Sequence, residues 1–393
     1  MKNASRRSLL SFLGATTLFG SMPSFAKLTA SDPIMILIEL QGANDSLNTF
    51  VPYTNEYYYR LRPQIHIPKS SVLHLNDNLG FHPALTEVAK LYERGECAVI
   101  QGLGYPQPVL SHFKSIELWE RGGDGRRSGG LNGWLVQPIN QLAAAIDYDA
   151  KAIFLDQEGG IFEGGGGGYL GPDSLGYKPV QFESRDATVP ISIGSEKIGL
   201  LGELIEMRGE ADRYLEMVQK KIQSRKREIY GFGNDGLSQQ LSKICNVISY
   251  GVRVPVFKVS LGSFDTHDNQ LPNHNSLLSM LDSGISQTVA ALKEMGLWRN
   301  SVIMTYSEFG RRVKENGSAG TDHGMAAAHF LLGGNISGGF VGSQPNLSSL
   351  DDNNFQFSLD YRALYDSILR GHFGVQQNLF EKYRSDELAG LFS

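Results

Sequence analysis

Pro33-Ile34-Met35-Ile36-Leu37-Ile38-Glu39-Leu40 forms a nearly continuous apolar run with several β-branched members, and Gly42 follows it. Such a run is typical of a buried strand in a parallel sheet, where both faces of the sheet are covered. Short apolar runs of the same kind recur at residues 97–101, 152–155, 189–193, 255–261 and 301–306. We therefore predict a core of parallel strands that begins near residue 33.

Segments with helical length and pattern separate these strands, at residues 83–94, 111–121, 197–230, 275–295 and 361–372. This alternation predicts an α/β fold in which helices cover both faces of the sheet. Residues from about 121 to 187 are rich in glycine and include the run Gly164–Gly168. That run lacks the Lys-Ser/Thr ending of a P-loop, so we predict a loop-rich insertion there. Residues 27–393 are predicted to form a single domain.

The composition is that of an ordinary globular protein. The chain has 393 residues, of which 41% are hydrophobic and 20% are charged, and this excludes extended disorder. Because 36 basic residues face 41 acidic ones, giving a net charge of −5, we do not expect nucleic-acid binding. Cys97 and Cys245 are too few for a disulfide scaffold or a thiolate metal cluster, although one bridge between them stays open.

The amino-terminal segment resembles a twin-arginine export signal. Arg6 and Arg7 precede an apolar stretch at residues 9–19, and Ser24-Phe25-Ala26 places small residues around a cleavage point. We predict a signal peptide at residues 1–26, recognition by the twin-arginine translocase, and a periplasmic or secreted product. The apolar stretch is shorter than the ~20 residues that span a bilayer, so no stable membrane span is expected and a permanent anchor is the alternative.

Polar side chains cluster where the predicted strands end. The candidates are Asn44, Asp45, Asp265, His267, Glu308, Arg311, Asp322 and His323. Asp265 and His267 are two residues apart, so in extended backbone both project to one side, as a shared metal requires. Parallel α/β sheets bind ligands at the carboxyl ends of their strands, and carboxylates mixed with imidazoles suit Zn²⁺, Mn²⁺ or Fe²⁺ better than Ca²⁺ alone. The alternative for each residue taken singly is a helix cap or a structural histidine.

Five ordered motifs carry a resemblance to a known family: Gly42–Asn48, Gly102–Pro106 with Ser111–Phe113, Phe264–His267, Ser307–Arg311 and Thr321–Gly324. They resemble a bacterial family catalogued as domain of unknown function 1501, over residues 33–374. That family looks like a branch of the alkaline phosphatase and sulfatase superfamily. The resemblance implies a three-layer α/β/α sandwich with a mostly parallel central sheet and a metal site at the strand ends.

The resemblance also implies roles for individual residues. Asp45 would contact a metal, Asp265 and His267 would bind one ion, and Glu308 would stand at the position of the second. His323, with Asp322 beside it, would be the last ligand. Ser111 would occupy the nucleophile position, although a helix N-cap is an equal reading of this residue. If the protein is an enzyme, a second cation or Arg311 would neutralise charge on the substrate, and Asn44, His112 and His329 could support the site.

The chain departs from the superfamily pattern at two points. Asp265 and His267 are separated by Thr266 alone instead of three residues, and Glu308-Phe309 replaces the usual Asp-His pair, so one or two ions remain possible. The Cys/Ser-x-Pro-x-Arg context of formylglycine sulfatases does not occur at Cys97, Cys245 or Ser111. We expect an exported, metal-dependent hydrolase of phosphate esters, with sulfate esters second, that uses Zn²⁺ or Mn²⁺. Its substrate would be a small-molecule or glycan-linked ester; the alternative is a non-catalytic periplasmic binding or assembly protein that keeps the fold.

Overall fold

The computed structural model describes residues 32–156, 159–175, 195–225, 228–344, 346–350, 352–376 and 379–392, without the side chains of residues 173, 175 and 195–207. The predicted signal peptide and the strand predicted at residues 189–193 lie outside the described residues. Among the residues that are described, no helix combines the length and the apolar character that crossing a bilayer requires.

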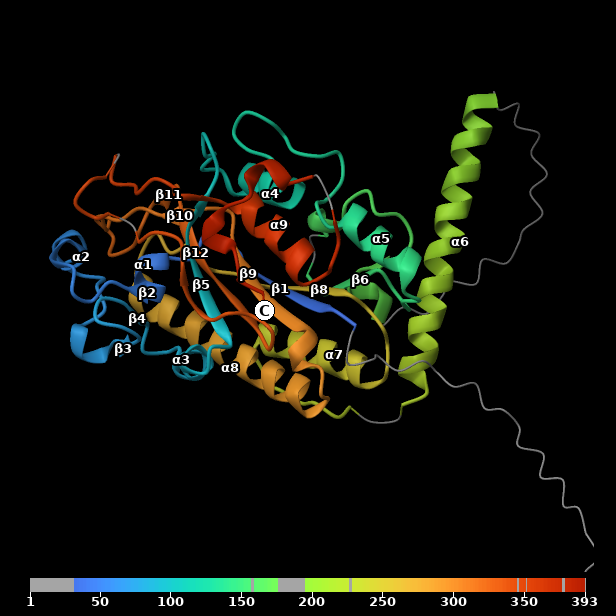
Figure 1. Cartoon of the computed structure of the whole chain (residues 1–393), viewed down its shortest axis with the longest axis horizontal. Helices are drawn as coiled ribbons and strands as arrows, with labels where there is room; N and C mark the ends of the chain where they lie inside the picture. Colours follow the sequence, from blue (N-terminus) through green and yellow to red (C-terminus); the bar gives the residue numbers. More distant parts are fainter. Residues whose placement is uncertain are drawn as a thin grey trace, which may run out of the picture.

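A nine-stranded sheet forms the middle layer of the molecule (Figure 1). Its order is β13 (Gly339–Val341), β5 (Cys97–Gly104), β12 (Ala327–Gly333), β9 (Ser301–Tyr306), β1 (Ile34–Leu40), β8 (Val256–Leu261), β6 (Ala152–Phe154) and β7 (Tyr169–Leu170), and β14 (Leu359–Asp360) also pairs with β5. β12 runs antiparallel to both of its neighbours, and the other pairings are parallel. The run that opens the sequence is thus a central strand.

Helices cover both faces of this sheet (Figure 1). One face packs on α3 (Thr86–Glu93), α7 (Gly236–Ser249) and α8 (Gln270–Glu294), and the other on α4 (His112–Arg121), α5 (Val136–Ala145) and α9 (Tyr361–Gly371). Alternate side chains of β1 supply the two cores: Ile36 and Ile38 pack in the first, Met35 and Leu37 in the second. Complete burial of this strand on both sides explains why its sequence is apolar without alternation.

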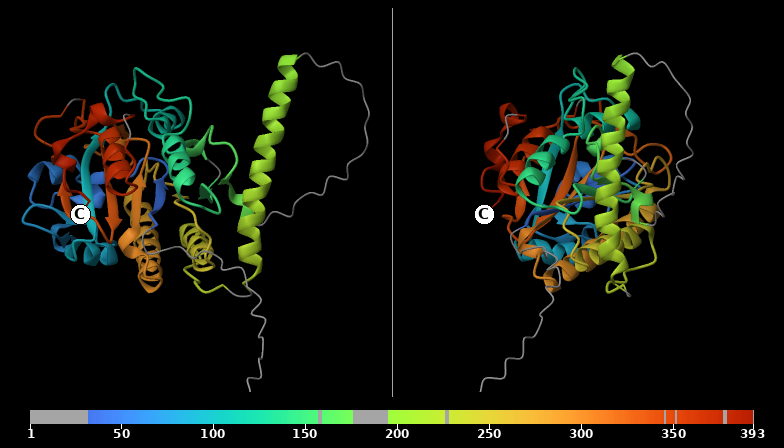
Figure 2. Two further views of the ribbon diagram at one scale, coloured as in Figure 1. Left: turned by 45° about the vertical axis from the view of Figure 1, so that its right-hand side comes forward. Right: turned by 90° about the vertical axis from the view of Figure 1, so that its right-hand side faces the viewer.

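Smaller elements surround the three layers. They are α1 (Ser46–Thr49), α2 (Glu56–Leu61), the sheet of β2 (Phe50–Val51), β4 (Gly80–Phe81) and β3 (Leu73–His74), the hairpin of β10 (Gly310–Arg311) and β11 (His323–Gly324), and short 3-10 helices at Lys69–Ser71, Gly160–Phe162, Pro172–Leu175, Trp298–Asn300, Glu381–Tyr383 and Asp386–Leu388. Figure 2 shows α6 (Ser195–Gln223) as a long helix at one side of the layers. Lys221 of α6 donates to Asp149 at 2.6 Å.

The predicted fold class is confirmed: the chain is a three-layer α/β/α sandwich with a mostly parallel central sheet. The pattern missed α5, α7 and β12, and it placed the start of α8 too late. α8 begins at Gln270 because Pro272 stands in its first turn, where the missing N–H breaks no helical hydrogen bond. Cys97 and Cys245 are both buried and free, so the open question of a bridge is answered: the structure has no disulfide between them.

Lys258, in the middle of β8, is a fully buried cation. Its Nζ lies 2.8 Å from Glu39 Oε2 and 3.8 Å from Glu120 Oε1, and it also donates to Asp156. Burial alone would lower the pKa of Lys258, but the surrounding carboxylates raise the pKa above its ordinary value, so the ammonium stays charged. The lysine thereby neutralises acidic groups from β1, α4 and the loop after β6 at one buried point.

We predict that Lys258→Met lowers the free energy of unfolding by about 3–5 kcal/mol, because it removes one partner from a buried ionic group and leaves the carboxylates there without its charge. Urea unfolding followed by circular dichroism measures the change. The same substitution at the exposed Lys243 of α7 is the control, with an expected change within about 0.5 kcal/mol. Equal stability of the two variants would contradict the electrostatic role of Lys258.

Candidate metal centre

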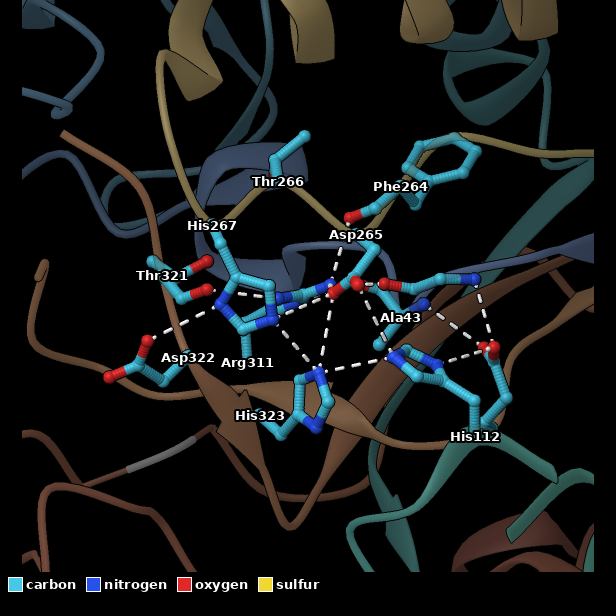
Figure 3. Close-up of polar contacts among 12 residues, drawn as sticks. Ala43, His112, Phe264, Asp265, Thr266, His267, Arg311, Thr321, Asp322 and His323 are labelled. Atoms are coloured by element: carbon cyan, nitrogen blue, oxygen red, sulfur yellow. Dashed lines mark hydrogen bonds and ion pairs between the residues drawn. The ribbon is translucent and has the colours of Figure 1, made fainter. Parts of the chain in front are cut away.

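The loops that follow β1, β8 and β9 meet at one edge of the sheet, since the carboxyl ends of parallel strands share an edge. The same edge receives the start of α4, which follows β5, and the start of β12, which is antiparallel and therefore enters the sheet from this side. The topology thus gathers residues that are far apart in sequence. They are His112 from α4, Asp265 and His267 after β8, and His323 before β12 (Figure 3).

Three imidazoles and one carboxylate converge in this cluster (Figure 3). His323 Nε2 lies 3.1 Å from both His112 Nε2 and His267 Nε2, and 3.2 Å from Asp265 Oδ1. Asp265 also lies 3.0 Å from His267 Nε2 and 3.5 Å from His112 Nε2. His112, Asp265 and His323 each offer one ligand atom, and these atoms all lie within 4.8 Å of one another. We call His112, Asp265, His267 and His323 the histidine cluster.

Each imidazole is oriented by a partner on its other ring nitrogen. His112 Nδ1 lies 3.0 Å from Glu308 Oε1, His267 Nδ1 lies 3.3 Å from Asp322 Oδ1, and His323 Nδ1 lies 3.0 Å from the carbonyl oxygen of Leu110. A carbonyl only accepts, so His323 Nδ1 carries the proton and its Nε2 is an acceptor in the neutral ring. Carboxylate or carbonyl partners of this kind are a regular feature of metal-binding histidines.

The cluster fits a divalent transition metal. Burial holds the pKa of His323 below its ordinary value, which favours the neutral ring that binds a metal. Burial would raise the pKa of Asp265, but the hydrogen bond and charge of Arg311 hold the pKa below its usual range, so the carboxylate is an anion. Imidazole nitrogens and an anionic oxygen that face one another at about 3 Å are a donor set for a cation such as Zn²⁺ or Mn²⁺.

Glu308 lies outside this donor set and is occupied by four donors. Its Oε1 accepts from Gly42 N at 2.9 Å and from His112, and its Oε2 accepts from Ala43 N at 3.0 Å and from Ser307 Oγ at 2.6 Å. Burial would raise the pKa of Glu308, but the hydrogen bonds from His112 and Ser307 hold the pKa below its ordinary value. The structure therefore places Glu308 as the anion that orients His112 and the turn after β1.

That turn depends on Gly42. Its φ is +105°, in the region that favours glycine, and a Cβ there would collide with the backbone nitrogen of Asp265. The turn after β1 and the loop after β8 can approach each other this closely only because residue 42 has no side chain.

Arg311 connects the loops of the site to one another. Its side chain is fully buried and donates to Ala43 O at 2.8 Å, Thr321 O at 2.9 Å and Asp265 Oδ1 at 2.5 Å, as well as to the carbonyls of Gly42 and Phe264. A guanidinium with no exposed surface and these partners does not reach a substrate. The sequence-based expectation that Arg311 neutralises substrate charge is therefore corrected to a positioning role.

Asp45 lies in a different buried group. Its Oδ2 accepts hydrogen bonds from Arg62 Nη1 and Gln270 Nε2, both at 2.5 Å. Its Oδ1 caps α1 by accepting a hydrogen bond from the backbone nitrogen of Leu47. Burial would raise the pKa of Asp45, but Arg62 holds the pKa below its usual range. Because Arg62 already neutralises this carboxylate, the structure does not bring Asp45 into the histidine cluster as the superfamily pattern implies.

The remaining predicted residues differ in their distance from the cluster. Asp322 contacts it through His267, whereas Asn44 is bonded to Thr49 and His274. His329 in β12 is buried against Trp119, and neither ring nitrogen has a hydrogen-bond partner in the described part of the chain. Burial lowers the pKa of His329 to about 3, so the ring is neutral.

Ser111 directly precedes His112 of the cluster. It is exposed and occupies the N-cap position of α4, but its side chain makes no capping hydrogen bond among the described residues. Its two neighbours, Leu110 and His112, both contact His323, the first through its carbonyl oxygen and the second through Nε2. Ser111 is thus exposed next to two residues that contact the cluster, and no hydrogen bond of its hydroxyl is found among the described residues.

From the sequence, His112 is expected only to support the site, whereas the structure makes it a member of the cluster. The signal was its position at the first turn of a helix directly after a core strand, next to the candidate nucleophile. Its convergence with residues 265–267 and 323 depends on the position of α4 beside β12, and no local pattern shows that position.

Known proteins resemble the chain only distantly. The chain is similar to the C-terminal periplasmic domain of EcEptC from Escherichia coli in complex with Zn (8% identity, 79% of this chain and 75% of that chain, TM-score 0.37). It is also similar to the lipoteichoic acid synthase LtaP from Listeria monocytogenes (11%, 92% and 77%, TM-score 0.41) and to the PsFucS1 sulfatase from Pseudoalteromonas sp. (12%, 92% and 72%, TM-score 0.37). No curated protein sequence matches it.

The carboxyl-terminal half of the chain has a clearer relationship. A family model described as "Protein of unknown function (DUF1501)" matches residues 201–385. The matched segment contains Asp265, His267, Glu308, Arg311 and His323, whereas His112 lies before it. Over residues 201–385, the chain therefore resembles the DUF1501 family.

Proposed function

We propose that this protein is an exported, metal-dependent hydrolase of phosphate esters. The observation that carries the proposal is the convergence of three Nε2 atoms on the carboxylate of Asp265, with the opposite nitrogen of every ring anchored. A folded protein gains nothing from placing acceptor nitrogens face to face unless a cation or proton lies between them. The predicted twin-arginine signal supports the export part of the proposal.

The histidine cluster would hold one ion, Zn²⁺ or Mn²⁺. When bound, such an ion supplies a Lewis acid that polarises an ester oxygen. Among the described residues, the two carboxylates expected at a second ion are already occupied, because Arg62 neutralises Asp45 and four donors bind Glu308. We therefore propose a single-ion site, in keeping with the Glu308-Phe309 sequence that replaces the superfamily's Asp-His pair.

Some residues of the site position the cluster, and one acts as the nucleophile in our proposal. Arg311 fixes Asp265, and Glu308 and Asp322 fix the rings of His112 and His267. Ser111 is the nucleophile in our proposal, since its hydroxyl is exposed beside His112 and is not used as a cap. The helix N-terminus that it begins favours negative charge, and this lowers the cost of forming an alkoxide or holding a phosphoryl group there.

The reaction that we propose has two balanced steps. Ser111 Oγ forms a bond to phosphorus while the bond from phosphorus to the leaving alkoxide breaks, and the serine proton ends on the released alcohol. Water then forms a bond to phosphorus, the bond to Ser111 Oγ breaks, and the hydroxyl of Ser111 is restored. The net products are an alcohol and inorganic phosphate. Sulfate esters rank second because no formylglycine context surrounds Ser111.

The metal is tested first, by elemental mass spectrometry of the protein purified without added metal. We expect about one transition-metal ion per chain and its loss from the His267→Ala, His323→Ala double variant, which removes two of four donors. His74→Ala is the matched control, because His74 is exposed and lies outside the cluster, with its ring stacked on Tyr53. A metal content unchanged in the double variant would overturn the ligand assignment, and a folded, metal-free wild type would favour the binding-protein alternative.

The nucleophile is tested separately by steady-state kinetics with p-nitrophenyl phosphate. Ser111→Ala should lower kcat/KM by at least about a hundredfold, because a nucleophile acts only in the reaction steps. Ser385→Ala, which removes a capping serine from the short 3-10 helix at Asp386–Leu388, should leave kcat/KM unchanged. Full activity of Ser111→Ala would exclude the covalent route and leave direct attack by water.

A further inference from the structure

A groove with a volume of about 500 Å³ adjoins the histidine cluster. Its lining includes Arg60 at the end of α2, Arg312 and Lys314 after β10, and Asp322. Asp322 connects the groove to the cluster, because its Oδ1 lies 3.3 Å from His267 Nδ1. A molecule that reaches the cluster along this side therefore passes three basic side chains.

The basic side chains of the groove outweigh its acidic ones. Glu315 also lines the groove, but its carboxylate is buried and accepts from the backbone nitrogens of Gln64 at 2.9 Å and Ile65 at 3.0 Å, so those donors occupy its oxygens. Asp322 accepts from Asn316 and His267 in the same way.

The three basic side chains of the groove have fewer hydrogen-bond partners than its carboxylates. Arg312 donates to Asp352 at the surface, Arg60 lies over the ring of Tyr57, and Lys314 is exposed. Lys314 has no ion pair within the described part of the chain. The lining therefore carries three basic side chains against the two carboxylates of Glu315 and Asp322.

Part of the cluster is open to solvent. The side chains of Asp265 and His267 are 44% exposed and that of Asp322 is 52% exposed. On the opposite side, His112 packs against Phe309 at 4.9 Å between ring centroids and is bonded to the buried Glu308. Figure 3 shows Asp322 and His112 at opposite ends of the cluster. A substrate that is bound at the cluster and extends past Asp322 reaches the basic groove.

We propose that this groove is a binding subsite for a second anionic group of the substrate, held by Arg60, Arg312 and Lys314. The inference rests on the proposed function and narrows its substrate class to esters that carry at least one negative group beyond the one that is cleaved. Arginine and lysine recognise phosphate, sulfate and carboxylate groups alike, so the shared chemistry is a compact anion. Phosphate monoesters with a neutral remainder would use the cluster without the groove.

The test is isothermal titration calorimetry with inorganic tripolyphosphate, in low salt and with a chelator that removes divalent metal. At low ionic strength, Arg312→Gln and Lys314→Gln should each weaken binding by about fivefold, the upper range for one exposed charge, and the double variant by at least about tenfold. Arg299→Gln and Lys243→Gln are the controls and should bind as the wild type does. Arg299 is exposed and precedes β9, at the edge of the sheet opposite to the cluster, and Lys243 is exposed on α7.

The outcomes separate this inference from the proposed function. Tripolyphosphate binding that survives chelation and falls in the double variant supports the groove, even if the protein proves to hold no metal and to hydrolyse no ester. Binding that is unchanged in the double variant overturns it, whatever the metal content. Binding that disappears on chelation also overturns it, while leaving the metal centre intact. Parallel titrations with a sulfated disaccharide and with trigalacturonate identify which anion the groove prefers.

Discussion

The guanidinium of Arg311 is the interaction on which the geometry of the site depends. It binds carbonyl oxygens of the turn after β1, of the loop after β8 and of the loop before β11, and it holds the carboxylate of Asp265. Three separate loops are therefore fixed to one another by a single buried cation. Because the planar group presents its donors in a fixed fork, it sets the directions of these loops as well as their separation.

Around this cation the charges alternate in a consistent order. Asp265 faces Arg311 on one side and the imidazoles on the other, and the outer nitrogens of His112 and His267 face Glu308 and Asp322. A cation between the imidazoles would extend the same alternation by one step. The buried group of Lys258 and its carboxylates follows the same rule within the sheet, where burial makes an unbalanced charge most costly.

Sequence patterns predicted the fold class because the core strands are short, apolar and spaced by helices. They missed β12 because a buried antiparallel strand looks like a parallel one, and they missed α7 because its amphipathic segment follows closely on α6.

For the site, Asp265, His267 and His323 were singled out by residue type and position after or near strands. The patterns could not separate them from Glu308 and Asp45, since the difference lies in partners such as Arg62, His112 and Gly42 that only the folded chain brings near. The assignment of Arg311 failed for the same reason: its sequence neighbours do not show that its side chain is buried.

The position of β1 has a consequence for how the chain is made. β1 is near the amino terminus of the described chain, yet its two neighbours, β8 and β9, are more than two hundred residues later in the sequence. The middle of the sheet therefore consists of contacts with large sequence separation, which form slowly because a long loop must close first. During synthesis, β1 remains without either neighbour until most of the chain has left the ribosome. An apolar strand in that state is prone to aggregate, so a long-lived nascent chain would need protection at this segment.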